Sequence, residues 1–261
     1  LIVMSCNKKN EINKDTSFTP IINVDQIKPP HWWVGFESNE LQILLKSDQI
    51  QNMDVTIDYP GVKVLKVNTA DSPNYLFIDI EIDKNTSPGY IELLFSSNDS
   101  IHHKLRYHLK KRTKPSLDFT GFNSEDAIYL ITPDRFANGN PNNDIQIELK
   151  EQRIDRNDGY ARHGGDIEGI IKNIDYINDM GFTAIWSCPL RTNDMESGSY
   201  HGYAITNHYQ VDPRFGTLDE FKTLVKEADK RDIKFIMDQI VNHCGLYHWW
   251  MKDLPFKDWL N

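Results

Sequence analysis

IKFIMDQIVNHCG, residues 233–245, is the stretch that decides the fold predicted for the second half of the chain. Its short apolar run, residues 233–237, stops at Asp238, and Asn242 and His243 follow. This pattern is typical of a buried strand, and in α/β folds the carboxyl end of such a strand carries functional groups. Taken alone, the stretch also fits a strand followed by an ordinary polar turn.

Strand and helix patterns alternate upstream of this stretch. AIYLIT (127–132) and FTAIWS (182–187) are buried-strand patterns, a helix begins at Asp166, and Thr217 with Glu220 forms a capping box before a second helix. Such repeats predict a parallel sheet with right-handed crossovers. A polar loop follows each strand and no Gly-rich phosphate loop is present, so we expect the first part of a (β/α)8 TIM barrel rather than a doubly wound sheet.

The preceding residues follow a different pattern. Short alternating runs separated by turn residues predict an all-β sandwich of immunoglobulin-like size. We therefore expect four regions. They are a tether over 1–30, the β-sandwich over 31–113, a linker over 114–126, and the N-terminal part of an α/β barrel over 127–261.

Composition limits the classes of partner. A net charge of −9 and the lack of a basic stripe argue against nucleic acid. An aromatic content of 11%, with 6 Trp, suits a flat ligand such as carbohydrate. Cys188 and Cys244 each follow a predicted strand, and we expect two buried thiols, with a disulfide as the alternative.

Two loops carry candidate site residues. FANGNPNND (136–144) offers amide and carboxylate oxygens, which Ca²⁺ prefers, although an Asn-rich surface turn has the same composition. SYHGYAITNHYQVDPRFG (199–216) offers flat rings beside hydrogen-bonding groups, as sugar recognition requires. The same side chains could simply anchor a long loop.

Four motifs in order resemble the α-amylase family of glycoside hydrolases: PDRFANGNPNND, HGGDIEGI, YHGYAITNHYQVDPRFG and DQIVNH. The resemblance is greatest to the neopullulanase and cyclomaltodextrinase branch, including its Bacteroidetes members. PPHWWVGFESNELQILL (29–45) is similar to the start of that branch's N-terminal sandwich, so the resemblance extends from about Pro29 onward.

The resemblance implies a substrate site for an α-glucan oligosaccharide. His243 would donate a hydrogen bond to the sugar in the reacting subsite, and Asp238 would organise the site behind it. Tyr203 would stack under the same sugar ring, and His201 would help to shape the pocket.

The resemblance also implies a Ca²⁺ cofactor. Its ligands would be Asn138, Asn140, Asn143, Asp144, the backbone carbonyl of Gly164, and Asp166. Asn140 stands where the family often has Asp, and the lost charge should weaken the site.

The implied reaction is retaining hydrolysis of α-1,4-glucosidic bonds in starch, maltodextrin, cyclodextrin or pullulan. No catalytic residue is assigned in this chain, because the family's nucleophile and acid follow later strands and would lie beyond Asn261. Asp134, Asp166 and Asp238 are therefore not taken as the nucleophile. The 261-residue chain alone should be inactive, and a homodimer through the N-terminal domain is compatible with the branch.

Two other classes of function remain open at this stage. One is a non-catalytic glucan-binding lipoprotein. The other is a transglycosylase, or a sucrose- or trehalose-type enzyme, on the same scaffold. The residues up to His243 do not separate these from a hydrolase.

The first residues, LIVMSC followed by NKKN, resemble the end of a bacterial lipoprotein signal, with Cys6 as the lipidated residue. The alternative is an arbitrary hydrophobic N-terminus with a free thiol. The lipoprotein reading implies export to the periplasm or outer membrane of a Gram-negative bacterium. Attachment would be through a lipid anchor only, since no apolar run is long enough to span a bilayer.

This reading is tested by fatty-acid labelling of the protein expressed from its complete gene in a Gram-negative host. We expect a radioactive fatty acid to label the wild type and the control variant Cys244→Ser, but not Cys6→Ser, because the lipid is attached to that sulfur. Labelling that survives in Cys6→Ser would refute lipidation at this position.

Overall fold

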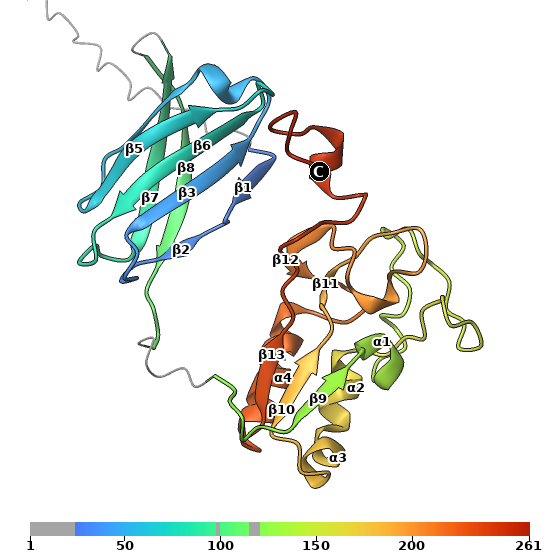
Figure 1. Ribbon diagram of the computed structural model, residues 1–261. Helices are drawn as coiled ribbons and strands as arrows, with labels where there is room; N and C mark the ends of the chain where they lie inside the picture. Colours follow the sequence, from blue (N-terminus) through green and yellow to red (C-terminus); the bar gives the residue numbers. More distant parts are fainter. Residues whose placement is uncertain (1–23, 98–99, 115–120) are drawn as a thin grey trace, which may run out of the picture. The chain divides into compact units, whose positions relative to one another are not determined.

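The computed structural model describes residues 24–97, 100–114 and 121–261, and these fall into two compact units (Figure 1). Residues 24–114 and Pro255–Asn261 form the first unit, and residues 121–254 form the second. The segment Pro255–Asn261 groups with the first unit, where Phe256 stacks on Phe77. Cys6 lies outside the described residues.

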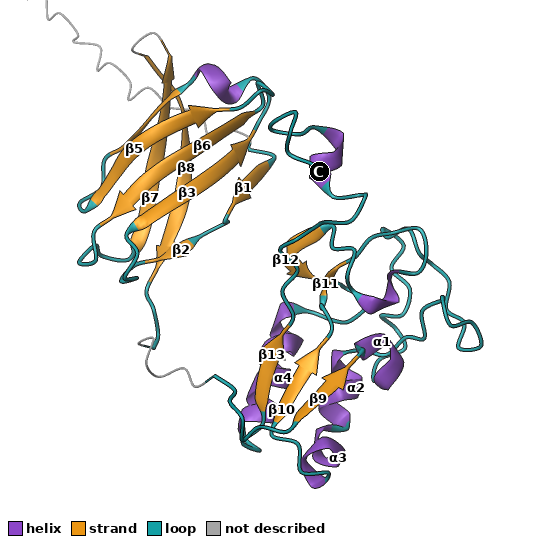
Figure 2. Cartoon of the chain, viewed as in Figure 1, coloured by secondary structure: helices purple, strands orange, loops and turns teal. Residues whose placement is uncertain are grey.

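The first unit is a sandwich of two four-stranded sheets (Figure 2). One sheet has the order β1-β3-β6-β5, with strands at Gln26–Lys28, Glu40–Lys46, Tyr75–Ile82 and Val62–Thr69. The other has the order β2-β8-β7-β4, with strands at Trp32–Trp33, Ser100–Lys110, Gly89–Ser97 and Asp54–Ile57. A short 3-10 helix, η1 (Ile50–Asn52), precedes β4.

Alternating side chains build the core of the sandwich. In β3, Leu41, Ile43 and Leu45 point inward, whereas Glu40 and Gln42 are exposed. Ile91 and Phe95 of β7 meet them from the opposite sheet, and both are fully buried. A strand with one face buried has a side-chain period of two, which is why the sequence pattern identified these strands.

The tether predicted for residues 1–30 ends earlier than expected. β1 pairs antiparallel with β3, with Gln26 opposite Lys46 and Lys28 opposite Leu44. A three-residue edge strand is too short to show a recognisable period in the sequence. Asp126, placed in the predicted linker, is similarly part of the second unit, because its carboxylate pairs with Lys234 at 2.8 Å.

The second unit has a three-stranded parallel sheet in the order β13-β10-β9, from Lys234–Met237, Ala184–Ser187 and Ile128–Ile131. The helices are α1 (Pro133–Phe136), α2 (Ile167–Lys172), α3 (Ile174–Asp179) and α4 (Leu218–Asp229). Between β10 and α4 lie β11 (Arg191–Thr192), η3 (Ser199–His201) and β12 (Asn207–Val211), and η4 (Trp249–Lys252) follows β13. Ile131 and Ile185 of the sheet join Ile170 and Leu224 of the helices in one core.

The helix starts follow the predicted capping residues. The Asp166 side chain accepts a hydrogen bond from the Gly169 N–H, and Thr217 and Glu220 form the predicted capping box before α4. The first predicted helix is interrupted at Asn173, whose Nδ2 donates to the Gly169 carbonyl at 2.8 Å. An Asn side chain that competes for helix carbonyls in this way favours a break.

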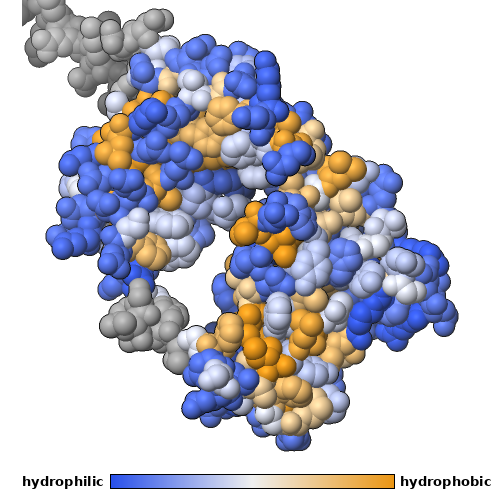
Figure 3. All heavy atoms as spheres, in the orientation of Figure 1, coloured by the Kyte–Doolittle hydropathy of each residue, from blue (hydrophilic) through white to orange (hydrophobic). Residues whose placement is uncertain are grey.

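The other face of the sheet is apolar and largely uncovered. Strand register places Ile128, Leu130 and Trp186 on the face away from the helices, where they are 37%, 58% and 40% exposed. Figure 3 shows hydrophobic residues gathering over the second unit. Parallel sheets are normally covered on both faces. This face is exposed within the described residues, so it lacks its usual cover there. Among those residues, none of the helices has the length and apolar character needed to cross a membrane.

Candidate functional site

The candidate site lies at the carboxyl edge of the parallel sheet. Thr132 follows β9, Cys188 follows β10 and Asp238 follows β13. Because the strands are parallel and in register, these three residues reach the same edge. The Thr132 Oγ1 and Cys188 Sγ atoms are 3.5 Å apart.

Tyr203 reaches this edge from the long loop between β10 and α4. Its hydroxyl donates a hydrogen bond to Asp238 Oδ2 at 2.9 Å and lies 3.7 Å from Cys188 Sγ. The turn before it requires Gly202, which has a φ of 85°, and an added Cβ there would lie 2.2 Å from the Pro189 carbonyl oxygen. The glycine in YHGY therefore serves the close approach of this loop to the end of β10.

Two histidines bond to the backbone of Tyr203. The Tyr203 N–H donates to His201 Nδ1 at 3.0 Å, so that nitrogen carries no proton. His243 Nε2 lies 2.9 Å from the Tyr203 carbonyl, which only accepts, so Nε2 is the protonated nitrogen of His243. Its N–H is therefore engaged with Tyr203 in this structure, and a sugar would have to share or replace that bond.

The four residues predicted to bind substrate thus form one connected group. Tyr203, His201 and Asp238 are half-buried, while His243 is exposed. Hydrogen bonds link residues 201, 203 and 243 within the loops, and link Tyr203 to Asp238. Their role toward a substrate stays a prediction.

The surroundings of Tyr203 and His201 favour the neutral forms of these two side chains. Burial, together with the hydrogen bonds to Cys188 and Asp238, raises the pKa of Tyr203 well above its usual value. Burial and the nearby Arg162 guanidinium lower the pKa of His201, against a smaller opposing effect of Glu151. A neutral imidazole and a neutral phenol beside one carboxylate suit a polyhydroxylated, uncharged ligand.

The Asn-rich loop gathers oxygen atoms around Gly164. The carbonyl oxygens Oδ1 of Asn138 and Asn143 are buried and have no hydrogen-bond partner among the described residues. Asn138 Nδ2 donates to both carboxylate oxygens of Asp144, at 2.8 and 3.0 Å. An added Cβ at Gly164 would lie 2.6 Å from that amide and 2.7 Å from Asp144 Oδ1, so its backbone lines the same space.

The other two predicted calcium ligands are engaged within the loop. Asp166 accepts four hydrogen bonds, from the N–H groups of Gly139, Asn140 and Gly169 and from the Asn143 amide. Asn140 Oδ1 accepts the Asn142 N–H at 3.2 Å. These two residues hold the loop in shape in this structure. Within the described ranges, no group of three or more His, Cys, Asp or Glu residues is arranged to hold a metal ion.

Sequence reasoning missed a cluster of buried charges. Glu151, Arg162, Asp212 and Arg214 are each at most 4% exposed, and they pair with one another. Glu151 belongs to none of the motifs, and isolated charges in loops show no periodicity. Only the presence of Asp212 and Arg214 in the motif YHGYAITNHYQVDPRFG, and the closeness of Arg162 to HGGD, could have suggested it.

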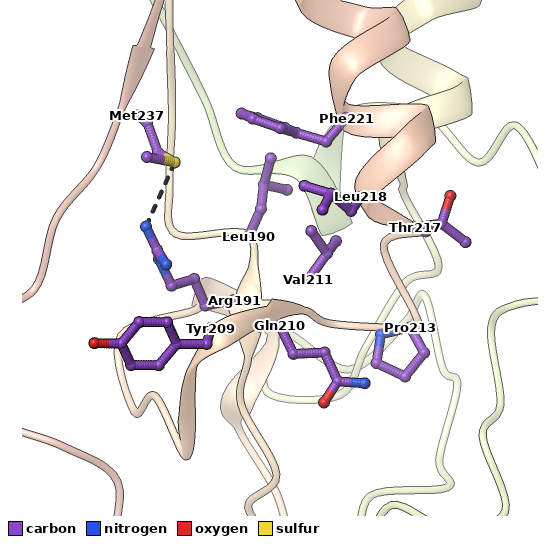
Figure 4. Close-up of a pocket in the computed structure, with 11 residues that line it drawn as sticks. Leu190, Arg191, Tyr209, Gln210, Val211, Pro213, Thr217, Leu218, Phe221 and Met237 are labelled. Atoms are coloured by element: carbon purple, nitrogen blue, oxygen red, sulfur yellow. Dashed lines mark hydrogen bonds between the residues drawn. The ribbon is translucent and has the colours of Figure 1, made fainter. Parts of the chain in front are cut away.

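A cavity of about 490 Å³ lies beside the site between β12 and the start of α4 (Figure 4). Leu190, Val211, Phe221 and Met237 line it, and Arg191 approaches the Met237 sulfur. None of the residues predicted to bind substrate lines this cavity.

Comparison with known proteins matches each of the two units to a protein family. Residues 130–258 match the family "Alpha amylase, catalytic domain", and residues 26–113 match the family "Cyclomaltodextrinase, N-terminal". Residues 130–258 belong to the alpha-amylase family. The sandwich and the βα units are therefore the N-terminal domain of the cyclomaltodextrinase type and part of the alpha-amylase catalytic domain, as predicted.

Individual relatives match about half of the chain. The chain is 42% identical to a beta/alpha-amylase of Paenibacillus polymyxa over 47% of this chain and 10% of that protein. It is 37% identical to neopullulanase 2 of Thermoactinomyces vulgaris over 52% of this chain and 24% of that protein. The chain is also similar to the crystal structure of an Anoxybacillus alpha-amylase, with 53% sequence identity and a TM-score of 0.45. The match covers 49% of this chain and 26% of that chain. The chain thus spans about a quarter or less of these relatives.

The bond between Tyr203 and Asp238 predicts energetic coupling between the two residues. We expect Tyr203→Phe and Asp238→Ala each to lower the free energy of unfolding, with a coupling of about 1 kcal/mol in the double variant, because each removes the same hydrogen bond. Urea unfolding of the four proteins measures this. Tyr160→Phe is the control, because Tyr160 is 81% exposed. Strictly additive effects would show that the bond contributes nothing.

Proposed function

We propose that this protein is a glycoside hydrolase of α-glucans that cleaves α-1,4-glucosidic bonds with retention of configuration. The observation that carries the proposal is the connected group of Tyr203, Asp238, His201 and His243 at the carboxyl edge of the sheet. The names of the matched relatives, alpha-amylase and neopullulanase, support the substrate class.

In this proposal the described residues bind and orient the sugar in the reacting subsite. The half-buried Tyr203 ring offers a flat face, and Asp238 fixes that ring through its hydroxyl. The two imidazoles supply hydrogen bonds to sugar hydroxyls. Retaining cleavage needs a nucleophilic carboxylate and a carboxylic acid about 5 Å apart.

The carboxylates nearest this edge are already committed to other partners. Asp134 is buried and accepts the N–H groups of His163 and Gly164 at 2.9 and 3.3 Å. Asp166 caps α2, and Asp238 binds Tyr203. We therefore propose that the nucleophile and the acid come from residues of the whole protein other than these.

The test compares the 261-residue chain with the protein encoded by the complete gene. We expect the complete protein to release reducing sugar from maltoheptaose, cyclodextrin or pullulan, and the α-anomer to appear first by NMR. The 261-residue chain should bind maltotetraose without cleaving it. Turnover of sucrose alone by the complete protein would overturn the proposal in favour of a sucrose-type enzyme. Glucan binding without any turnover by the complete protein would favour a glucan-binding protein.

We also propose a Ca²⁺ site in the Asn-rich loop. The orphaned oxygens of Asn138 and Asn143, the Asp144 carboxylate and the backbone at Gly164 supply the hard oxygen donors that this cation prefers. Burial raises the pKa of Asp144, and the neighbouring Asp166 and Asp134 carboxylates add to this effect. When bound, the cation would neutralise the negative charge of the Asp144 carboxylate. It would also join the loop to the start of α2.

Calcium should therefore stabilise the folded chain. At a free Ca²⁺ concentration 100-fold above its dissociation constant, we expect about 2.7 kcal/mol of added stability relative to EDTA. Thermal unfolding measures the shift. Asp144→Asn should abolish it, whereas Asp179→Asn, an exposed control with the same charge change, should retain it. If neither Ca²⁺ nor EDTA changes the melting temperature, the loop is an ordinary turn and not a Ca²⁺ site.

Export as a lipoprotein completes the proposal, with attachment through Cys6. Long polysaccharides do not cross the bacterial envelope freely, so an exported enzyme would meet its substrate outside the cytoplasm. The labelling experiment on Cys6→Ser decides this part independently of the enzymatic assay.

A further inference from the structure

A cluster of buried charges lies against the segment that carries Tyr203. Glu151, Arg162, Asp212 and Arg214 are 4%, 1%, 0% and 2% exposed. Burying a charge costs several kcal/mol unless it is paired and hydrogen-bonded. Each member must therefore find its partners in one arrangement of the chain, and that arrangement includes residues 198–203.

Glu151 binds the start of this segment directly. Its Oε1 accepts the Gly198 N–H at 3.0 Å, and its Oε2 accepts the Ser199 hydroxyl at 2.8 Å. The same Oε2 accepts Arg162 Nε at 3.2 Å. One carboxylate thus joins the backbone of the loop to a buried guanidinium.

Arg162 and Asn193 complete the contacts of Ser199. Arg162 Nη2 donates to the Ser199 hydroxyl at 3.0 Å, and Asn193 Nδ2 donates to the Ser199 carbonyl at 3.0 Å. Asn193 is in turn fixed by Asp212, whose Oδ2 accepts the Asn193 N–H at 3.0 Å. Ser199 is fully enclosed, and its hydroxyl and its carbonyl are both bound.

The constraint extends from Ser199 to the candidate site over a very short path. Ser199 begins η3, and Gly202, held against the Pro189 carbonyl, leads into Tyr203. One turn of 3-10 helix and a tight glycine turn leave little freedom between the cluster and the Tyr203 ring. A displacement of Ser199 would move His201 and Tyr203 with it.

We infer that Glu151 and Arg162 are positioning residues, which hold residues 198–203 so that His201 and Tyr203 face Asp238 for α-glucan binding. This inference rests on the proposed function for its ligand. Neither residue belongs to the group linked to Asp238, and they act through Ser199. The effect of both charges on the pKa of His201 agrees with their closeness to the site.

The decisive variant replaces both charges together, as Glu151→Gln with Arg162→Met, in the 261-residue chain. Replacing a buried ion pair by neutral groups of similar volume is often tolerated, whereas removing one partner leaves an unpaired buried charge. We expect the double variant to stay folded and to bind maltotetraose at least tenfold more weakly than the wild type. Glu148→Gln, an exposed residue in the same segment, is the matched control and should bind as the wild type does.

Amide hydrogen exchange and histidine NMR separate positioning from general stability. In the double variant, exchange should quicken at least tenfold at residues 198–203 while the sheet residues of β9 and β10 keep their protection. In Glu151→Gln alone the pKa of His201 should fall, because a nearby negative charge is lost. A uniform rise in exchange across the second unit would show a merely structural role and overturn the inference.

The outcomes for binding are also distinct. If the wild type binds maltotetraose and the folded double variant binds it equally well, the positioning role is overturned while the proposed function stands. If the wild type does not bind maltotetraose, the proposed function loses its support, and the exchange data alone report whether the cluster fixes the loop.

Discussion

The candidate site depends on burying four charges without leaving any of them unpaired. The segment between β10 and α4 contains only two short strands and one turn of 3-10 helix, so regular backbone hydrogen bonding cannot fix its course. Arg214 and Asp212 make a bidentate pair at 2.9 and 2.8 Å, and Arg162 joins that pair to Glu151. The penalty for an unpaired buried charge selects the one loop conformation in which all of them are satisfied.

The parallel sheet supplies the other half of the site. Its strands end in register, so Cys188 and Asp238 meet the hydroxyl of Tyr203 although they are distant in sequence. The strands fix one wall and the loop brings the aromatic ring to it. Rigid strand ends combined with a fixed loop are the arrangement expected of a preorganised binding site.

Period-two alternation predicted the sandwich strands, and continuous apolar runs predicted the three parallel strands. Elements with neither pattern were missed. The sandwich strands and the capping box of α4 followed from period-two alternation and from Thr217 with Glu220. β1 is too short for any period, and the break at Asn173 depends on one side-chain hydrogen bond. The meeting of Tyr203 with Asp238 was inferred from the family resemblance, because local pattern carries no information on such distant contacts.

The charged cluster was beyond sequence reasoning for a related physical reason. Charged residues in loops are usually solvated, so nothing in the chain distinguishes the buried Glu151 from the exposed Glu148. Only the tertiary structure shows that Ser199 lies between Glu151 and Arg162.

The uncovered sheet face bears on how the polypeptide emerges from the ribosome. The sandwich closes its core with strands from residues 26–110, so it can fold as soon as that length has left the exit tunnel. The β9–β10–β13 sheet instead presents Ile128, Leu130 and Trp186 to water until something covers them. Apolar surface that is exposed during folding is prone to aggregation. During synthesis, the sheet is therefore exposed to aggregation for an interval in which the sandwich is already folded.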